Sequence, residues 1–543
     1  MKPVGSVGLT WRAEAAEHAE PAANLFARYA TERCDLRVAP GGHGEFTVDL
    51  ANDRALGAES YRIASVGNAV ARISGGDRLG LIYGVGKFLH TSHYTPDGFV
   101  ASPWRGASAP DCPMRGMYLA THFDNFYETA PADEVQRYVE DLALWGINSL
   151  LLHFGPSQYA SMDAPEAQAN LKQIRGLMRI GRRLGLRVGL IQTVNKGWAD
   201  APRELRAKPY PDDWHRRGTL GVNICPSTPE GRRYLMDIHE RLFDFLADTG
   251  VDILCPWPYD EGGCGCDPCW PWGSKGFLDL SRDVAKLARQ SNPHLQVILS
   301  TWMFDSPPAG EWAGLRDALA AGNDWIDYIM ADAHEDFPRY PLVEGVPGGL
   351  PLVNFPEISM WGMWPWGGCG ANPLPQRLQR LWNQVRSVAA GGFPYSEGIF
   401  EDLNKVVCLG FQWQKDRPVE EILREYVGCE YSAAETESLL AVLATLERNH
   451  VRDIREPTPP VLTGAAEAFD RIERAERTLT SRVRAGWRWR ILYLRALIDR
   501  ELELNGGRFK GAAIQEAFAE LSRIYHVTAN TLDGIHPPRP GDL

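Results

Sequence analysis

The segment Val251-Asp252-Ile253-Leu254-Cys255-Pro256-Trp257-Pro258-Tyr259-Asp260-Glu261-Gly262-Gly263-Cys264 places two adjacent carboxylates just after an apolar run. The run from Val251 to Cys255 predicts a buried β-strand, because short apolar runs bounded by turn residues are typical of such strands. Asp260 and Glu261 then follow the expected end of this strand. Taken alone, the pair favours an ordinary solvated turn. The rest of the chain reverses that preference.

The same order of strand, loop and helix repeats from Met114 onward. Thr228 followed by Pro229, for example, predicts a helix N-cap with proline at the first helical position. Eight strand–helix units over about 290 residues fit a (β/α)8 TIM barrel, whereas a doubly wound open sheet would more often have about six strands. The predicted strands are Met114–Ala120, Ile147–His153, Arg187–Val194, Val251–Pro256, Gln296–Thr301, Trp325–Ala331, Leu350–Asn354 and Gly392–Tyr395.

Two further domains are expected to flank this α/β barrel. Residues 1–110 predict a small N-terminal α/β domain that ends at a proline-containing linker. Residues 111–414 would form the barrel, with its last helix marked by Leu378, Leu381, Val385 and Val388. Residues 415–543 have helical periodicity and many charge pairs at helical spacing, which predicts a C-terminal helical domain.

Composition excludes several classes of function. The chain has 543 residues, of which 44% are hydrophobic and 23% charged, as in soluble globular proteins. Its net charge of -12 argues against a nucleic-acid partner. We find no apolar run long enough to span a membrane and no signal-peptide core near the N-terminus, so we expect a cytoplasmic protein. The helical tail offers a surface for a homodimer.

Carboxylates and tryptophans collect where the barrel strands should end, and function in such barrels sits at those ends. Glycoside hydrolysis needs a pair of carboxylates beside flat apolar faces that stack on sugars. The catalytic candidates are Glu261, Asp260, Asp336 and Glu357. The candidates for binding a carbohydrate substrate are His122, Asp124, Asn125, His153, Asn195, Trp257, Trp302, Asp332, Trp361, Trp364 and Glu397.

Several of these candidates also have a purely structural interpretation. His153 is more typical of a hydrogen-bonded residue at the barrel mouth than of a catalyst. Asp124 and Asn125 could simply order the first loop. The tryptophans at 361–366 fit a buried cluster under a long loop as well as an exposed sugar platform.

A group of cysteines follows the carboxylate pair. Cys264, Cys266 and Cys269 would supply three thiolates, and a closed structural zinc site needs a fourth. Cys225, in the preceding barrel loop, is the best fourth candidate. In a reducing compartment such crowding suggests a metal before a disulfide, and the alternative is free or partly bridged thiols. We expect no cofactor for catalysis itself.

Short motifs resemble two families of glycoside hydrolase, the α-glucuronidases of family 67 and the β-N-acetylhexosaminidases of family 20. Residues 72–85 are similar to the end of the small domain that precedes the barrel in both families. Residues 115–117 with His122-Phe123-Asp124-Asn125 resemble the α-glucuronidase barrel start. The chain departs from both in its cysteine cluster, and Pro258-Tyr259 replaces the Gly-Gly that precedes the family 20 Asp-Glu.

The resemblance implies roles for the carboxylates. Glu261 matches the general acid, and Asp336 and Glu357 match the groups that activate water. In the family 20 pattern, Asp260 would instead orient the acetamido group of the substrate. We therefore expect an exo-acting glycoside hydrolase that resembles an α-glucuronidase and is inverting if Asp336 or Glu357 activates water.

Three alternatives stay open at this point. One is a retaining, substrate-assisted enzyme like the β-N-acetylhexosaminidases. Another is a carbohydrate-binding barrel without catalysis. The third is a metal-dependent hydrolase that uses His122, His153 and His334 as ligands.

Overall fold

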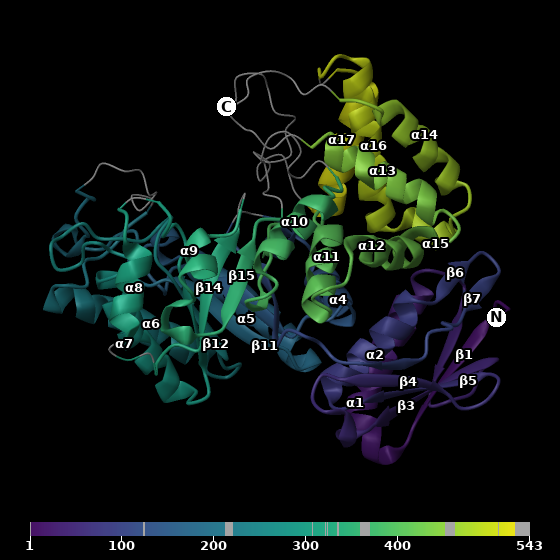
Figure 1. Ribbon diagram of the computed structural model, residues 1–543, viewed down its shortest axis with the longest axis horizontal. Helices are drawn as coiled ribbons and strands as arrows, with labels where there is room; N and C mark the ends of the chain where they lie inside the picture. Colours follow the sequence, from purple (N-terminus) through teal and green to yellow (C-terminus); the bar gives the residue numbers. More distant parts are fainter. Residues whose placement is uncertain are drawn as a thin grey trace.

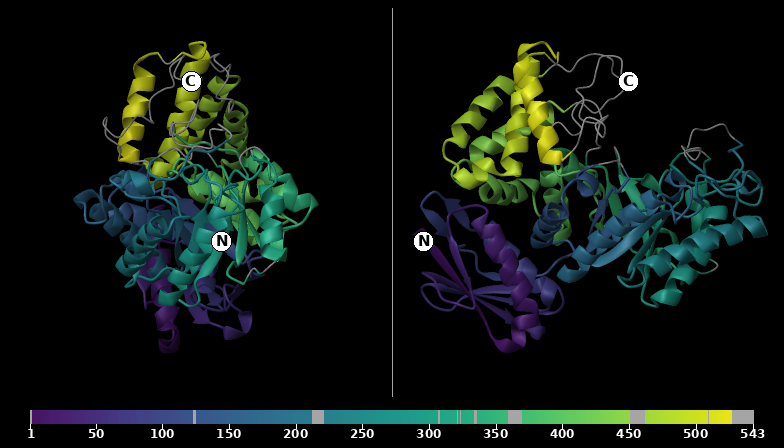
Figure 2. Two further views of the ribbon diagram at one scale, coloured as in Figure 1. Left: turned by 90° about the vertical axis from the view of Figure 1, so that its left-hand side faces the viewer. Right: turned by 180° about the vertical axis from the view of Figure 1, so that it is seen from behind.

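The computed structural model describes residues 2–122, 125–211, 221–306, 308–320, 322, 324–333, 336–358, 370–450, 462–508 and 510–526. Three parts are visible in Figure 1: an N-terminal α/β part, a barrel and a C-terminal group of helices. In Figure 2 the first and last parts lie beside each other at one end of the molecule, and the barrel extends away from them. The described helices include none with the length and apolarity that crossing a bilayer demands.

The central part is a closed parallel barrel, so the predicted (β/α)8 fold is confirmed. From β9 to β16 each strand pairs with the next, and β16 and β17 both pair with β9 to close the ring. The first seven predicted strands fall on observed ones. The strands are β9 Met114–Leu119, β10 Ser149–His153, β11 Arg187–Thr193, β12 Ile253–Trp257, β13 Gln296–Ser300, β14 Tyr328–Ala333, β15 Leu352–Pro356, β16 Ala389–Gly392 and β17 Tyr395–Ser396.

The eighth position of the barrel holds two short strands, so the single strand predicted at 392–395 is wrong. β16 and β17 both pair with β9, and Phe393 and Pro394 separate them. Proline lacks the N–H that a ladder needs, which accounts for a break here. Gly391 is essential to the close approach, because a Cβ at this position would lie 1.6 Å from the Met114 carbonyl oxygen.

Helices surround the barrel in the expected alternation. The N-cap predicted at Thr228 is present, and its Oγ1 accepts a hydrogen bond from the Gly231 N–H at 3.1 Å. The helix predicted to be the last of the barrel is α10, which follows the seventh strand. A further helix, α11, follows the eighth strand and was not predicted. The helices are α3 Phe126–Thr129, α4 Ala132–Leu144, α5 Pro165–Leu184, α6 Pro229–Leu246, α7 Gly276–Ser291, α8 Glu311–Ala320, α9 Arg339–Val343, α10 Pro375–Val385 and α11 Asp402–Trp413.

The N-terminal part is a six-stranded sheet in the order β2-β1-β3-β5-β4-β8, with α1 and α2 packed together against it. Strands β1, β2 and β8 of this sheet were not predicted. The bounds are β1 Ser6–Trp11, α1 Ala16–Thr31, β2 Arg37–Pro40, β3 Phe46–Asn52, β4 Tyr61–Ser65, β5 Val70–Gly75, α2 Arg78–His90, β6 His93–Thr95, β7 Gly98–Val100 and β8 Gly106–Ser108.

The C-terminal part is helical, and α16 packs against α14 and α17. Trp489 of α16 is fully buried. The exact domain boundaries and a homodimer through this part stay predictions. The elements are α12 Val419–Val427, the π-helical turn η6 Gly428–Ser432, α13 Thr436–Arg448, α14 Ala465–Glu476, α15 Ser481–Ala485, α16 Trp487–Leu504 and α17 Ala512–Tyr525.

A buried ion network joins the three parts. Arg488 of α16 donates to Asp141 of α4 at 2.8 Å and to Asp402 of α11 at 2.7 Å. Arg28 of α1 donates to the other oxygen of Asp141 at 2.6 Å. Each of the three parts therefore supplies at least one charge to a network that is closed to water at its centre.

Candidate active site

The carboxylate pair lies where β12 ends, as the sequence indicated. Asp260 has φ of 74°, a left-handed conformation that is uncommon for a residue other than glycine. Glu261 forms an ion pair with Lys196 at 3.0 Å. The Lys196 side chain is 2% exposed and that of Glu261 is 34% exposed, so the carboxylate stands between a buried cation and solvent.

The charge of Glu261 affects the pKa of two buried residues at the barrel mouth. Burial raises the pKa of the Tyr118 hydroxyl well above its usual value, and the charges of Glu261, Glu397 and Asp260 raise it further. Burial lowers the pKa of His153, while Glu261 opposes that shift. The ion pair with Lys196, which lies in the loop after β11, directs the Glu261 carboxylate towards the neighbouring strand end.

A second set of carboxylates lies across the mouth. Glu357 follows β15 and Glu397 follows β17, and both are nearly inaccessible to solvent. The Tyr395 hydroxyl donates to Glu397. Burial raises the pKa of Tyr395 well above its usual value, with further contributions from Glu397 and Glu357 among others. The rings of Tyr118 and Tyr395 lie 5.4 Å apart, so these two tyrosines stand between the two sets of carboxylates.

Aromatic rings form a floor beneath the carboxylates. The Trp257 ring lies 5.3 Å from that of Trp302 and 5.1 Å from that of Phe355. Phe355 in turn lies 5.8 Å from Tyr395. Flat apolar faces next to carboxylates are what a sugar ring requires for stacking and for bond cleavage.

Asp332, near the end of β14, differs from the other carboxylates in its protonation. Burial raises its pKa to about 7, and the charge of Asp305 contributes to the rise. A carboxyl group with this pKa is partly protonated at neutral pH and is able to donate a hydrogen bond. This is the environment that acid catalysis or recognition of a sugar oxygen calls for.

The raised pKa of Asp332 predicts a pH-dependent gain in stability when its charge is removed. The unfolded chain loses this proton near pH 4, and the folded protein keeps it to about pH 7, so stability falls as the pH rises between these values. Asp332→Asn should raise the free energy of unfolding at pH 8 by roughly 1–3 kcal/mol and change it little at pH 4. Thermal denaturation at both pH values measures the difference. The exposed Asp336→Asn is the control, and an equal effect of Asp332→Asn at both pH values would contradict the interpretation.

Two of the predicted site residues bond to backbone groups of nearby loops. Asn125 is buried and caps α3, with its side chain bonded to the Tyr127 N–H and the Ala120 carbonyl. The Asn195 amide bonds both backbone groups of Gly263, at 2.9 and 3.1 Å. These two asparagines therefore order loops, and their contact with substrate stays a prediction.

Asp336 is held by another element of the barrel, and its catalytic role stays a prediction. Its side chain is exposed and accepts a hydrogen bond at 2.8 Å from Gln384 of α10, which holds it towards an outer helix. Of the two residues predicted to activate water, Glu357 is the one that the structure places beside the tyrosines of the mouth.

The histidine pair lies at the mouth, but its third predicted partner is outside the described residues. The rings of His122 and His153 are 4.7 Å apart, and burial lowers the pKa of both. In the part of the chain that the structure describes, the only group placed to hold a metal is a set of cysteines. Asp124, Trp361, Trp364 and His334 lie outside the described residues.

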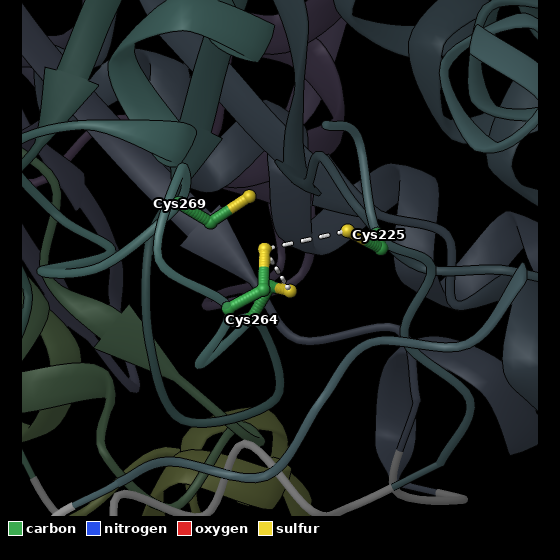
Figure 3. Close-up of side chains that lie close together, drawn as sticks. Cys225, Cys264 and Cys269 are labelled. Atoms are coloured by element: carbon green, nitrogen blue, oxygen red, sulfur yellow. Dashed lines mark hydrogen bonds between the residues drawn. The ribbon is translucent and has the colours of Figure 1, made fainter. Parts of the chain in front are cut away.

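The four predicted cysteines do come together. The Sγ atoms of Cys225, Cys264, Cys266 and Cys269 all lie within 4.8 Å of one another, and all four residues are buried. In Figure 3, Cys225 extends from one loop towards Cys264 and Cys269 on another. Metal binding by this group stays a prediction.

The sequence did not predict several residues of the site. Lys196 directly follows Asn195 at the third strand end, and a lysine at that position was a usable signal for a carboxylate partner. Tyr395, two residues before Glu397, was another. Glu401 was not predicted to belong to the site. Its carboxylate accepts a hydrogen bond from the Glu397 N–H at 3.0 Å, and burial raises its pKa to about 7.

Comparison with known proteins places this fold among glycoside hydrolases. No protein-family model and no curated protein matches the chain. Solved structures do. A family 115 4-O-methyl-α-glucuronidase with specificity for decorated arabinogalactans has a TM-score of 0.61 at 11% identity, over 98% of this chain and 78% of that enzyme.

Two further structures support the same assignment of fold. The family 89 glycoside hydrolase of Clostridium perfringens, in complex with GlcNAc-α-1,4-galactose, has a TM-score of 0.60 at 12% identity. The match covers 94% of this chain and 64% of that enzyme. The family 20 β-N-acetylhexosaminidase of Streptomyces coelicolor A3(2) has a TM-score of 0.52 at 15% identity, over 79% and 92% of the two chains. The resemblance to family 20 is thereby confirmed at the level of the fold.

Proposed function

We propose that this chain is an exo-acting glycoside hydrolase that uses carboxylates for acid and base catalysis. The observation that carries the proposal is the arrangement of the mouth: Glu261 on one side, Glu357 and Glu397 on the other, and an aromatic floor below. This is the equipment that cleavage of a glycosidic bond requires. The fold shared with several glycoside hydrolase families supports it.

Glu261 would protonate the leaving oxygen. It is the most accessible of the three glutamates, and Lys196 now donates to it, so a bound sugar must take the place of this ion pair before Glu261 can serve as the acid. Asp332, with its pKa of about 7, is the alternative acid. Glu357 would activate water in an inverting reaction. In a retaining, substrate-assisted reaction, the acetamido group would attack and Asp260 would orient it.

The sugar is best sought among those of the structural neighbours. The family 115 enzyme is an α-glucuronidase, the family 89 enzyme was bound to an α-linked N-acetylglucosamine, and the family 20 enzyme is a β-N-acetylhexosaminidase. A panel of nitrophenyl α-glucuronide and α- and β-N-acetylglucosaminides therefore covers these three bond types. The glycoside from which nitrophenol is released identifies the bond type that the chain cleaves.

Loss of the acid should depend on the leaving group. Glu261→Gln should lower kcat/KM by about 100-fold on a glycoside with a weakly acidic alcohol as leaving group, because that alcohol must leave with a proton. The loss should be smaller on the nitrophenyl glycoside, since nitrophenolate leaves without one. Steady-state kinetics on both substrates measures the ratio.

Matched variants make this test specific. Asp336→Asn, an exposed carboxylate near the mouth, should leave both rates unchanged. If Asp332→Asn shows the dependence on leaving group and Glu261→Gln does not, the acid is Asp332. Sugar binding without turnover on any substrate would contradict the proposal and favour a carbohydrate-binding barrel.

A further inference from the structure

We propose that Cys225, Cys264, Cys266 and Cys269 bind one Zn²⁺ in a closed structural site, and that this ion holds the loop that presents Glu261. The link to Glu261 rests on the proposed function, whereas the metal site does not. Four thiolates in a closed set leave no open position for water or substrate, so the ion would have no part in the chemical step.

The sulfur positions match a tetrahedral metal site. The Cys225 and Cys266 sulfurs are 3.6 Å apart, and the Cys264 and Cys266 sulfurs are 3.5 Å apart. A tetrahedron with Zn–S bonds of about 2.3 Å has S···S edges of about 3.8 Å. A disulfide would bring two sulfurs to about 2.05 Å. The observed spacing is close to the first geometry and far from the second.

The surroundings also suit a metal-bound thiolate. All four side chains are at most 7% exposed. The Ser227 hydroxyl lies 3.0 Å from the Cys225 sulfur and 3.4 Å from the Cys266 sulfur, where it could donate to either. Hydrogen bonds of this kind support metal ligands from the next layer of residues. Without a cation, four adjacent buried thiolates would repel one another, and soft ligands in tetrahedral geometry select zinc among the common divalent ions.

The site would join two loops of the barrel mouth. Cys225 belongs to the loop between β11 and α6, which also carries Lys196. The other three cysteines belong to the loop between β12 and α7, which carries Glu261. The Tyr210 hydroxyl already donates to the Gly262 carbonyl at 2.5 Å, and the Gly265 N–H donates to the Lys208 carbonyl at 2.9 Å. A metal bridge three residues beyond Glu261 would fix the end of a loop that hydrogen bonds hold along its length.

Metal analysis of the whole chain, purified without chelators, tests the site independently of catalysis. We expect about one zinc per chain, ten thiols titratable after denaturation in the presence of chelator, and a cobalt-substituted protein with the visible absorption of tetrahedral thiolate coordination. Iron in place of zinc, fewer than ten titratable thiols in protein prepared under reducing conditions, or no metal bound on titration with zinc would overturn the proposal.

A pair of cysteine variants tests which sulfurs bind. Cys225→Ser should lower the affinity for zinc, seen as faster transfer of the metal to a chromogenic chelator. Cys408→Ser, which changes a buried thiol on α11 outside the group, should retain it. Equal retention by both variants would contradict the assignment of Cys225. If Cys225→Ser does not fold, the zinc content of the wild-type chain still decides whether the metal site exists.

The effect on the acid loop has its own readout. Zinc removal should increase proteolytic cleavage between residues 262 and 269, and turnover should fall by up to about 100-fold because the acid is misplaced. Cleavage that increases without any change in an established turnover would show that the ion stabilises the loop but does not position Glu261, and would overturn that part of the proposal. Zinc in a chain without turnover would leave the metal site standing and count against the proposed function alone.

Discussion

Glu357→Gln should lower kcat/KM by about 10²- to 10⁴-fold on every substrate that the wild-type chain cleaves, whatever its leaving group. The expected loss exceeds that of Glu261→Gln, because a good leaving group replaces an acid but does not replace the group that activates water. Glu357 is buried beside Tyr395, and amide replacement keeps its shape while removing the charge. Steady-state kinetics on a nitrophenyl glycoside measures the loss.

Two controls accompany this measurement. Thermal denaturation of Glu357→Gln should show a folded protein, since the neutral amide keeps the size of the buried side chain. Glu397→Gln distinguishes the two carboxylates on this side of the mouth, because Glu397 accepts from Tyr395 and is expected to bind sugar rather than activate water. If Glu397→Gln removes turnover and Glu357→Gln spares it, the assignment of Glu357 is wrong.

Arg488→Met should lower the free energy of unfolding by about 3–5 kcal/mol, since removing one partner of a buried ion pair leaves its counter-charge unpaired. Arg488 pairs with three carboxylates, Asp141, Asp402 and Glu430. Only part of the loss is offset by Arg28 on Asp141, the Tyr426 hydroxyl on Asp402 and Arg33 on Glu430. Denaturant unfolding at pH 7 measures it. Arg482→Met is the matched control, because the exposed pair of Arg482 with Asp35 should contribute less than about 1 kcal/mol.

The loss caused by Arg488→Met should shrink in acid. Burial alone would raise the pKa of Asp141, but Arg28 and Arg488 lower it well below its usual value. A carboxylate with a lowered pKa contributes stability above its unfolded pKa of about 4, and that contribution is lost as the pH falls towards the folded value. The gap between wild type and variant should therefore be largest at neutral pH. A gap that is constant from pH 7 to pH 3 would show that packing, and not charge, is the cause.

The barrel could be predicted because its strands are buried on both faces. Runs such as Leu150-Leu151-Leu152 and Val297-Ile298-Leu299 stand out from the helical pattern around them, and their order along the chain gives the topology. The prediction of the eighth strand was wrong because Pro394 lies in the break between β16 and β17. Strands β1 and β2 were missed because the sheet order β2-β1-β3 depends on pairing between distant segments, which local pattern does not reveal.

The site could be predicted only in part, for a related reason. Residues within a few positions of a strand end, such as Glu261 and Glu357, are placed by the fold itself. Whether a polar side chain then faces substrate or backbone depends on neighbours from other loops, and Asn195 bonds to Gly263 from another loop. Lys196 was missed because a lysine is usually exposed, and only the three-dimensional structure shows it buried against Glu261.

The hydrogen bonds between Asn195 and Gly263 make the conformations of the loops after the third and fourth strands depend on each other. Transplanting either loop alone from a relative would separate the asparagine from the peptide that it holds and Lys196 from Glu261. Grafting both together would preserve these contacts. New sugar preferences should therefore arise most readily by changes in the loops after other strands, while these two loops are kept together.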